Sequence, residues 1–260
     1  MLELENNQNT SAVEEVPQGP SIDPVILDEM VKAGVLYGRK KSKTHPQMRK
    51  FIYMTRNGIE ILDLPRTMQA IEKAADFLKE VAKKDGLILA VGTKPASQVL
   101  IENFAKKLSM SFVIKRWLGG TLTNFKTISK RIQYYMNLKA DKAIGKLEKY
   151  TKKEQVGFEK EIVRLDGFFS GLEKMTKLPD VLVIVNANDH ITAVREAKRL
   201  KIPVVAILST DTDPEIVEYA IPANDNSTAS IAWILGKLQS KIEEGVKERL
   251  VTPVPVANGK

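Results

Sequence analysis

The chain has 260 residues, of which 43% are hydrophobic, and it contains no cysteine. This length suits one large hydrophobic core or two modest ones, and the lack of cysteine excludes disulfides, thiolate metal sites and a cysteine nucleophile. Lysine and arginine outnumber aspartate and glutamate by 40 to 32, and the resulting net charge of +8 favours an anionic partner.

The two ends of the chain read as tails. Residues 1–21 are rich in Asn, Gln and Glu, and they carry too little apolar area to offset the entropy lost on ordering. This acidic stretch matches neither a signal peptide nor an Arg-rich transit peptide, and no apolar run reaches the roughly 20 residues that span a bilayer. We therefore expect a disordered tail at 1–21, a second tail at 247–260, and a soluble cytoplasmic protein.

A short helix and a basic loop follow the first tail. Apolar spacing over residues 22–33, with Asp23 as N-cap and Pro24 at the first helical position, predicts a helix that ends near Gly34. Residues 39–50 then contain no carboxylate, and we interpret them as a loop that binds RNA phosphates. The cations of this loop are Arg39, Lys40, Lys41, Lys43, Arg49 and Lys50. Short cationic loops are also ordinary solvated surface, so this loop alone leaves both readings open.

Strands and helices alternate along much of the chain. The Asn57-Gly58 pair between two apolar runs predicts a β-hairpin. Continuous apolar runs are typical of strands buried on both faces of a parallel sheet. Strands are expected at 87–91, 181–185 and 204–208, and helices at 65–83, 190–200 and 227–244, with another helix opening after 92–95. This alternation predicts an α/β fold with a parallel sheet, helices on both faces and right-handed crossovers.

A helical hairpin is expected between residues 124 and 176, where no strand pattern occurs. The second arm carries apolar residues at steps of three and four, which is typical of a coiled-coil seam, and Thr151 with Glu154 forms a capping-box pattern at its start. The seam is expected to join Phe125, Ile128, Ile132 and Tyr135 to Phe158, Ile162, Leu165 and Phe169. We therefore divide the chain into a discontinuous α/β domain, 22–123 and 177–246, and an inserted hairpin, 124–176, whose seam packs on itself rather than on the α/β core.

The stretch 115–131, KRWLGGTLTNFKTISKR, is the most informative part of the sequence. It carries five cations and no carboxylate, which makes it attractive to a polyanion. Gly119-Gly120 permit backbone angles that other residues disfavour, so they read as a hinge between a core strand and a helix that leaves the core. Trp117 could stack on a base or plug a core. The candidate RNA-binding residues here are Lys115, Arg116, Trp117, Asn124, Lys126, Lys130 and Arg131.

Catalytic and metal-binding groups are sparse. The turn at 91–94 could hold a phosphate at a helix N-terminus, but it lacks both glycine-rich nucleotide fingerprints. His45 and His190 are the only histidines and lie far apart in the sequence, and His190 is interpreted as a capping or packing residue at a helix start. The hydroxyls and carboxylates of 209–214 could serve a ligand, but they also suit turns and helix starts. The sequence thus predicts no catalytic residue, no metal and no cofactor.

Residues 116–125, RWLGGTLTNF, resemble the most distinctive motif of the second protein of the bacterial-type small ribosomal subunit. Supporting matches follow the family's order over roughly residues 25–240: Arg56-Asn57-Gly58, 91–94, Leu178-Pro179-Asp180, His190 with Glu196-Ala197, Ile202-Pro203-Val204, Asp213-Pro214, and Ile221-Pro222 before Asn224-Asp225. The resemblance implies a Rossmann-like or flavodoxin-like domain with a protruding coiled-coil hairpin. It also implies contacts with 16S ribosomal RNA and other small-subunit proteins, including the large OB-repeat protein that captures messenger RNA, and no membrane or small-molecule partner.

The chain departs from this family at one loop. Residues 34–39, GVLYGR, stand where the family usually has Gly-x-His-Phe-Gly-His, and Arg39 adds a cation that we expect to bind phosphate. The leading hypothesis is a structural RNA-binding protein of the small ribosomal subunit. The alternatives are an enzyme on a nucleotide-binding fold, which architecture alone favours, and a protein-interaction scaffold that uses the hairpin as its arm.

Overall fold

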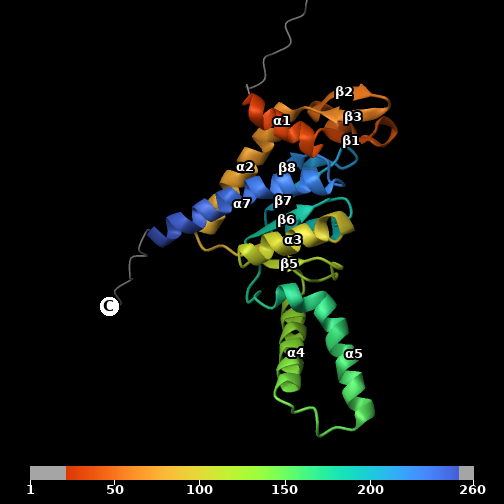
Figure 1. Ribbon diagram of the computed structural model, residues 1–260, viewed down its shortest axis with the longest axis vertical. Helices are drawn as coiled ribbons and strands as arrows, with labels where there is room; N and C mark the ends of the chain where they lie inside the picture. Colours follow the sequence, from red (N-terminus) through yellow and green to blue (C-terminus); the bar gives the residue numbers. More distant parts are fainter. Residues whose placement is uncertain (1–21, 252–260) are drawn as a thin grey trace, which may run out of the picture.

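A five-stranded parallel sheet forms the centre of the chain in a computed structural model, which describes residues 22–251 (Figure 1). Its strands are β4 (Ile88–Val91), β5 (Ser111–Val113), β6 (Val181–Val185), β7 (Val204–Leu208) and β8 (Tyr219–Pro222). They lie in the order β5-β4-β6-β7-β8, and every neighbouring pair is parallel. This is the flavodoxin-like order, whose switch point lies between β4 and β6. The predicted Rossmann-like or flavodoxin-like α/β fold is therefore confirmed.

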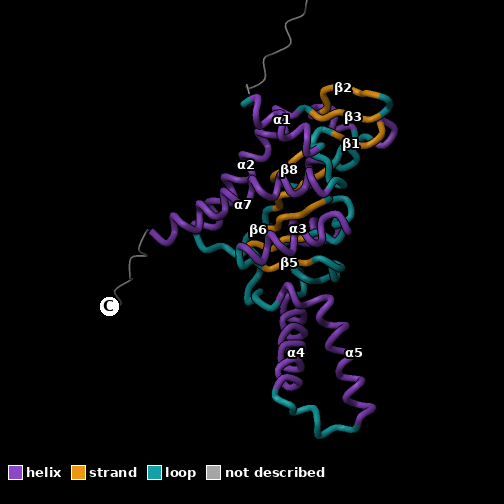
Figure 2. Tube along the Cα trace, viewed as in Figure 1, coloured by secondary structure: helices purple, strands orange, loops and turns teal. Residues whose placement is uncertain are grey.

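Helices cover both faces of this sheet, because successive strand residues point to opposite sides. In β6, Val181, Val183 and Val185 belong to one buried cluster, whereas Leu182 and Ile184 belong to another. The first cluster includes residues of four helices: α1 (Pro24–Ala33), α2 (Leu64–Lys83), α3 (Pro95–Lys107) and α7 (Thr228–Val251). These helices lie along one side of the strands in Figure 2. The second packs against α6 (Ile191–Arg199) and the bases of α4 (Phe125–Ala143) and α5 (Lys152–Phe169).

Two features near the C-terminal end of the chain differ from the prediction. Periodicity does not predict β8. This edge strand has only four residues, its last residue is proline, and it does not contain a long apolar run. The predicted tail at 247–260 is wrong for 247–251, which continue α7. The remainder of that tail, 252–260, and the predicted tail at 1–21 lie outside the described residues.

A second, antiparallel sheet of three strands lies at one end of the molecule (Figure 1). It consists of β1 (Tyr37–Lys40), β2 (Ile52–Arg56) and β3 (Ile59–Leu62), with β3 in the centre. Asn57 and Gly58 both have positive φ, 51° and 74°, as a two-residue hairpin turn requires, and the predicted hairpin is confirmed. The prediction of one loop over 39–50 is wrong, because residues 39–40 pair with β3 as part of β1 and short 3-10 helices follow at η1 (Lys41–Lys43) and η2 (Pro46–Phe51).

Two helices, α4 and α5, leave the other end of the molecule side by side (Figure 1). The predicted capping box is present: Thr151 Oγ1 accepts from the Glu154 N–H, and the Glu154 carboxylate accepts from the Thr151 N–H. Towards the tip, Phe158 contacts the ring of Tyr150 edge-on, with 5.2 Å between ring centroids. The coiled-coil character of the pair stays a prediction.

The expectation that the hairpin seam packs only on itself is wrong at the base of the arm. Ile132, Tyr135, Leu165 and Phe169 are buried in the same cluster as the sheet residues Leu89 and Val113. The reason is geometric: α4 begins and α5 ends beside the sheet, so their basal turns lie over strand side chains. The lower hairpin and the sheet therefore share one core.

Substitution in this shared core should lower the stability of the whole protein. Leu165→Ala or Phe169→Ala removes buried side-chain atoms and should reduce the free energy of unfolding by about 2–5 kcal/mol, measured by urea denaturation. Val163→Ala is the matched control, because Val163 lies on the same helix but is 72% exposed. If the variants lost helical circular dichroism while the main urea transition stayed unchanged, the α4–α5 pair would unfold independently of the sheet.

Candidate nucleic-acid interface

A buried carboxylate holds the loop between β5 and α4. Glu196 lies on α6 and is 8% exposed. Its two oxygens accept five hydrogen bonds, from Trp117 Nε1 (3.1 Å), Gly120 N (2.8 Å), Leu122 N (3.0 Å), Thr123 N (3.2 Å) and Thr123 Oγ1 (3.2 Å). Burial alone would raise the pKa of Glu196, but these hydrogen bonds outweigh it and the pKa is lowered. The loop is therefore closed onto α6 by a charged group.

Trp117 takes part in this closure. Its indole N–H donates to Glu196, and its half-buried ring packs against the second core cluster. Gly120 has a positive φ of 88°, so the special backbone angles predicted for the glycine pair are confirmed at Gly120, whereas Gly119 does not have a positive φ. Packing thus accounts for Trp117 within the chain, and base stacking by its ring stays a prediction.

The cations around this loop are exposed. We call Lys115, Arg116, Lys126, Lys130 and Arg131, together with Trp117 and Asn124, the helix surface. Lys115 and Arg116 lie just after β5, and the other three cations lie on the first two turns of α4. Among residues 22–251, no carboxylate lies within 4.0 Å of any of these five cations. Asn124 is the N-cap residue of α4, is exposed and makes no side-chain capping bond.

The other predicted cations surround the small sheet. We call Lys40, Lys41, Lys43, Arg49 and Lys50 the small-sheet surface, and all five are exposed. Lys50 has a long contact of 4.0 Å with Glu215. The small sheet and the α4–α5 pair lie at opposite ends of the molecule (Figure 1). The structure therefore forms two separate basic surfaces and does not bring the predicted residues together at one site.

Arg39 differs from the other predicted cations because its guanidinium is already paired. Its Nη2 lies 2.8 Å from Asp225 Oδ1, and its Nε lies 3.4 Å from Asp211 Oδ2. Its backbone N–H donates to Thr210 Oγ1 at 2.8 Å. These contacts fasten β1 to the loops that follow β7 and β8. Burial raises the pKa of Asp225 to about 6, against the opposing attraction of Arg39.

The turn at 91–94 and His190 meet at the switch point of the sheet. Thr93 Oγ1 lies 3.0 Å from His190 Nε2, the other ring nitrogen lies 2.9 Å from the carbonyl oxygen of Asn186, and Lys94 pairs with Asp189 at 2.7 Å. Burial lowers the pKa of His190, which favours the neutral ring. His190 occupies the N-cap position of α6 without a side-chain capping bond, so packing rather than capping describes it.

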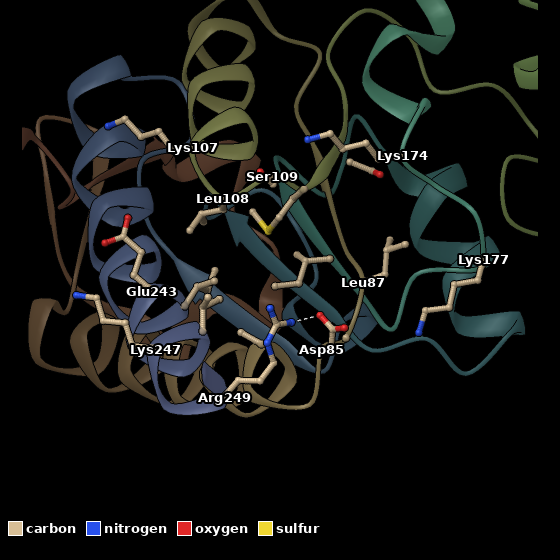
Figure 3. A pocket seen from close by; sticks show the side chains of 17 residues that line it. Asp85, Leu87, Lys107, Leu108, Ser109, Lys174, Lys177, Glu243, Lys247 and Arg249 are labelled. Atoms are coloured by element: carbon tan, nitrogen blue, oxygen red, sulfur yellow. Dashed lines mark hydrogen bonds and ion pairs between the residues drawn. The ribbon is translucent and has the colours of Figure 1, made fainter. Parts of the chain in front are cut away.

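A cavity of about 600 Å³ lies at the opposite edge of the sheet, where β4 and β5 begin (Figure 3). Apolar side chains such as Leu108 and Ile242 line it together with several lysines, and Arg249 pairs with Asp85 across one side. None of the predicted RNA-binding residues lines this cavity.

Residues 22–251 contain no group of three or more His, Cys, Asp or Glu side chains arranged to hold a metal ion. Within the same residues, no helix is both long and apolar enough to cross a membrane.

Sequence reasoning did not single out Glu196 or Asp225 as organising residues. A signal for Glu196 exists in α6, where the neighbouring buried positions are Ala193, Val194 and Ala197. A carboxylate on such an apolar helix face requires donors from elsewhere in the chain. The sequence does not say which donors these are.

Removal of the Glu196 charge should loosen the loop and lower stability. Glu196→Gln replaces one acceptor oxygen with an amide that cannot accept, so the free energy of unfolding at neutral pH should fall by about 1–3 kcal/mol. Because the pKa is lowered in the folded state, this stabilisation is present above the ordinary value of 4.5 and is lost as the pH falls below it. Glu102→Gln, which removes the half-buried partner of the exposed Lys106, is the control in the same urea titrations.

Removal of Arg39 should cost stability in a pH-dependent way. Arg39→Gln leaves Asp225 buried without a cation, at a cost of about 3–5 kcal/mol. A carboxyl group with a raised pKa stabilises the fold most below its ordinary value of 3.8, and this contribution is lost as the pH rises through about 6. The variant should therefore lose more stability at pH 8 than at pH 5.

A second substitution separates this effect from simple loss of packing. Arg39→Gln with Asp225→Asn should recover much of the loss, because no buried charge is left unpaired. Arg56→Gln, at an exposed position, should change little. Equal losses at both pH values would mean that the Asp225 charge is not the cause.

Comparison with known proteins places the chain among ribosomal proteins. The family model described as ribosomal protein S2 matches residues 30–245. The small ribosomal subunit protein uS2 of Thermus thermophilus is 41% identical over 213 residues, which cover 82% of this chain and 83% of that protein. The uS2 proteins of Coprothermobacter proteolyticus (40% over 225 residues, 86% of this chain and 84% of that protein) and Dictyoglomus thermophilum (42% over 221 residues, 85% and 90%) are similarly close. With this extent of match, the chain belongs to the ribosomal protein S2 family.

Proposed function

We propose that this chain binds 16S ribosomal RNA through the helix surface and the small-sheet surface, and so helps to assemble and hold the small ribosomal subunit of the cytoplasmic ribosome. As a member of the ribosomal protein S2 family, it is a structural, non-enzymatic component of that subunit and takes part in translation. The RNA-binding part of the proposal goes further than family membership and rests on the arrangement of charge.

The observation that carries the RNA proposal is that the cations of the helix surface are exposed and form no ion pair within the described residues. Lysines elsewhere, such as Lys79 and Lys139, pair with glutamates. Exposed cations without internal partners are available to phosphates, and their binding releases the counterions of the RNA. The loop held by Glu196 fixes where Lys115 and Arg116 lie, so less order has to be gained on binding.

Arg39 is given a different role from the one expected. Its pairing with Asp225 and Asp211 makes it a structural residue that holds the small sheet in place. The phosphate contacts on that side of the molecule are assigned to the exposed Lys40, Lys41, Lys43, Arg49 and Lys50.

We also propose contacts with neighbouring small-subunit proteins, including the large OB-repeat protein that captures messenger RNA. The support for that protein as partner is the family resemblance. The α4–α5 pair is the proposed protein-binding arm, because it projects from the end of the molecule opposite the small sheet (Figure 1).

The RNA proposal predicts that affinity for RNA falls steeply with salt concentration and that each phosphate contact contributes separately to the slope. Lys130→Gln with Arg131→Gln removes two proposed phosphate contacts, so the slope of log affinity against log salt should become less steep by about 1.4–1.8. Binding of a 16S ribosomal RNA fragment by the purified full chain, measured over a range of salt concentrations, checks this.

The matched control removes two cations from the far face of the sheet. Lys106 and Lys107 end α3, and Lys106→Gln with Lys107→Gln should leave the slope close to that of the unsubstituted protein. Equal flattening by both pairs would mean that only net charge matters and that the helix surface is not the binding site.

A further inference from the structure

We propose that the outer face of the small sheet binds unpaired RNA by stacking a base on Tyr37. This inference rests on the RNA-binding function proposed above. It adds contacts with bases to contacts with phosphates, at the end of the molecule far from the helix surface.

Strand pairing sets two rows of side chains across this face. Residues directly opposite each other on neighbouring strands share a face of the sheet. Tyr37 and Met54 both lie opposite Ile61 of the central strand. Lys40 and Arg56 both lie opposite Ile59. The outer face therefore carries an apolar row, Tyr37-Ile61-Met54, beside a row with a cation at each end, Lys40-Ile59-Arg56.

A register shift in β1 directs these side chains outwards. The shift lies between Tyr37 and Lys40. Because of it, Gly38 and Arg39 both lie on the inner side of the small sheet, the side that faces the large sheet. A Cβ on Gly38 would lie 2.5 Å from Thr210 Cγ2, and Arg39 reaches Asp225. The inner side is thus fastened to the large sheet, and Tyr37 and Lys40 are left on the side that faces away from it.

The apolar row is uncovered. Tyr37 is 50% exposed and Met54 48%, and Ile61 between them is half-buried. In the neighbouring row, Ile59 is 39% exposed. An exposed aromatic ring beside cations is typical of surfaces that bind single strands, where the ring stacks on a base and the cations contact phosphates. A base inside a duplex is already stacked on its neighbours and is not splayed out for such contacts. The occupant is therefore an unpaired segment of a few nucleotides.

Charge favours RNA over a protein as the occupant. Residues 37–62 contain seven lysines and arginines and one carboxylate, Glu60. Glu60 is 4% exposed and accepts hydrogen bonds from Thr55 and Thr44, and its partner Thr55 in β2 places it on the other face from Ile59 and Ile61. No carboxylate of this segment lies on the outer face, which is complementary to a phosphate backbone.

Substitutions at Tyr37 separate stacking from apolar contact. The probe is a fluorescent oligouridine, compared with a blunt RNA duplex, and the protein is the full chain. Tyr37→Leu keeps an apolar side chain but removes the ring, so affinity for oligouridine should fall about 5- to 150-fold. Tyr37→Phe should bind as the unsubstituted protein does. Tyr53→Leu is the matched control, because Tyr53 is 71% exposed on the edge strand β2 but lies outside both rows.

A second measurement uses assembled small subunits that contain the chain. Ultraviolet irradiation followed by nuclease and trypsin digestion should leave a nucleotide adduct on the peptide 33–39, which contains Tyr37. Adducts on peptides from α4 with none on 33–39 would overturn the stacking proposal and leave the helix-surface proposal standing. A chemical cross-link from Lys40 to another protein, with no adduct on 33–39, would also overturn it and assign the face to a protein.

Three results of the binding measurements would overturn the inference. Tyr37→Leu binding oligouridine as tightly as the unsubstituted protein would overturn the inference even where the Lys130 and Arg131 substitutions change the salt slope. An equal loss of affinity for oligouridine and duplex would overturn it as well, because stacking discriminates between them. No binding of any RNA by the unsubstituted chain would overturn this inference together with the proposed function.

Discussion

The charged carboxylate of Glu196 is the interaction on which the helix surface depends. A carboxylate can be buried only when donors replace the water that it loses, and here all its donors come from residues 117–123. The same bonds satisfy backbone N–H groups of a tight turn that pairs with neither strand nor helix. The arrangement is reciprocal: the loop keeps Glu196 charged, and Glu196 fixes the path of the chain from β5 into α4. The positions of Lys115, Arg116 and the first turns of α4 follow from that path.

This interaction also explains why the distinctive motif at 116–125 has so many small and apolar residues for a segment on a basic surface. Trp117, Leu122 and Thr121 are buried or half-buried, and their role is to close the loop onto α6. The cations that flank them are the part of the segment that faces solvent. One short stretch therefore has two functions: its centre positions the loop, and its flanks carry the charge that we assign to RNA.

The edge of the sheet where flavodoxin-like folds bind ligands is used here for internal contacts. The carboxyl ends of the parallel strands carry Thr93 against His190 and Lys94 against Asp189. Arg39 from the small sheet reaches Asp211 and Asp225 after β7 and β8. Polar side chains at this edge thus join the small sheet to the large one. The example supports the rule that a fold alone does not assign a function.

Periodicity was sufficient to predict the parallel sheet, because β4, β6 and β7 are continuous apolar runs that only burial on both faces explains. It could not predict β8, whose place at the edge depends on pairing with β7. Nor could it predict the merger of the hairpin base with the sheet, which depends on where α4 begins and α5 ends. Charge counting found the exposed cations of the helix surface but not the pairing of Arg39, since its partners lie 172 and 186 positions further along the chain (211 − 39 and 225 − 39). Contacts between distant segments are the part that local pattern does not contain.

The separation of the two basic surfaces has a consequence for binding. They lie at opposite ends of one folded body (Figure 1), joined through the large sheet rather than by a flexible linker. When one surface is bound, the other is held at a fixed position, so a single RNA that presents sites at the matching separation gains affinity without any new contact. An RNA that presents only one of the sites does not. Under the proposed function, a small protein of modest net charge favours one large folded RNA over the many other polyanions that its cations could contact.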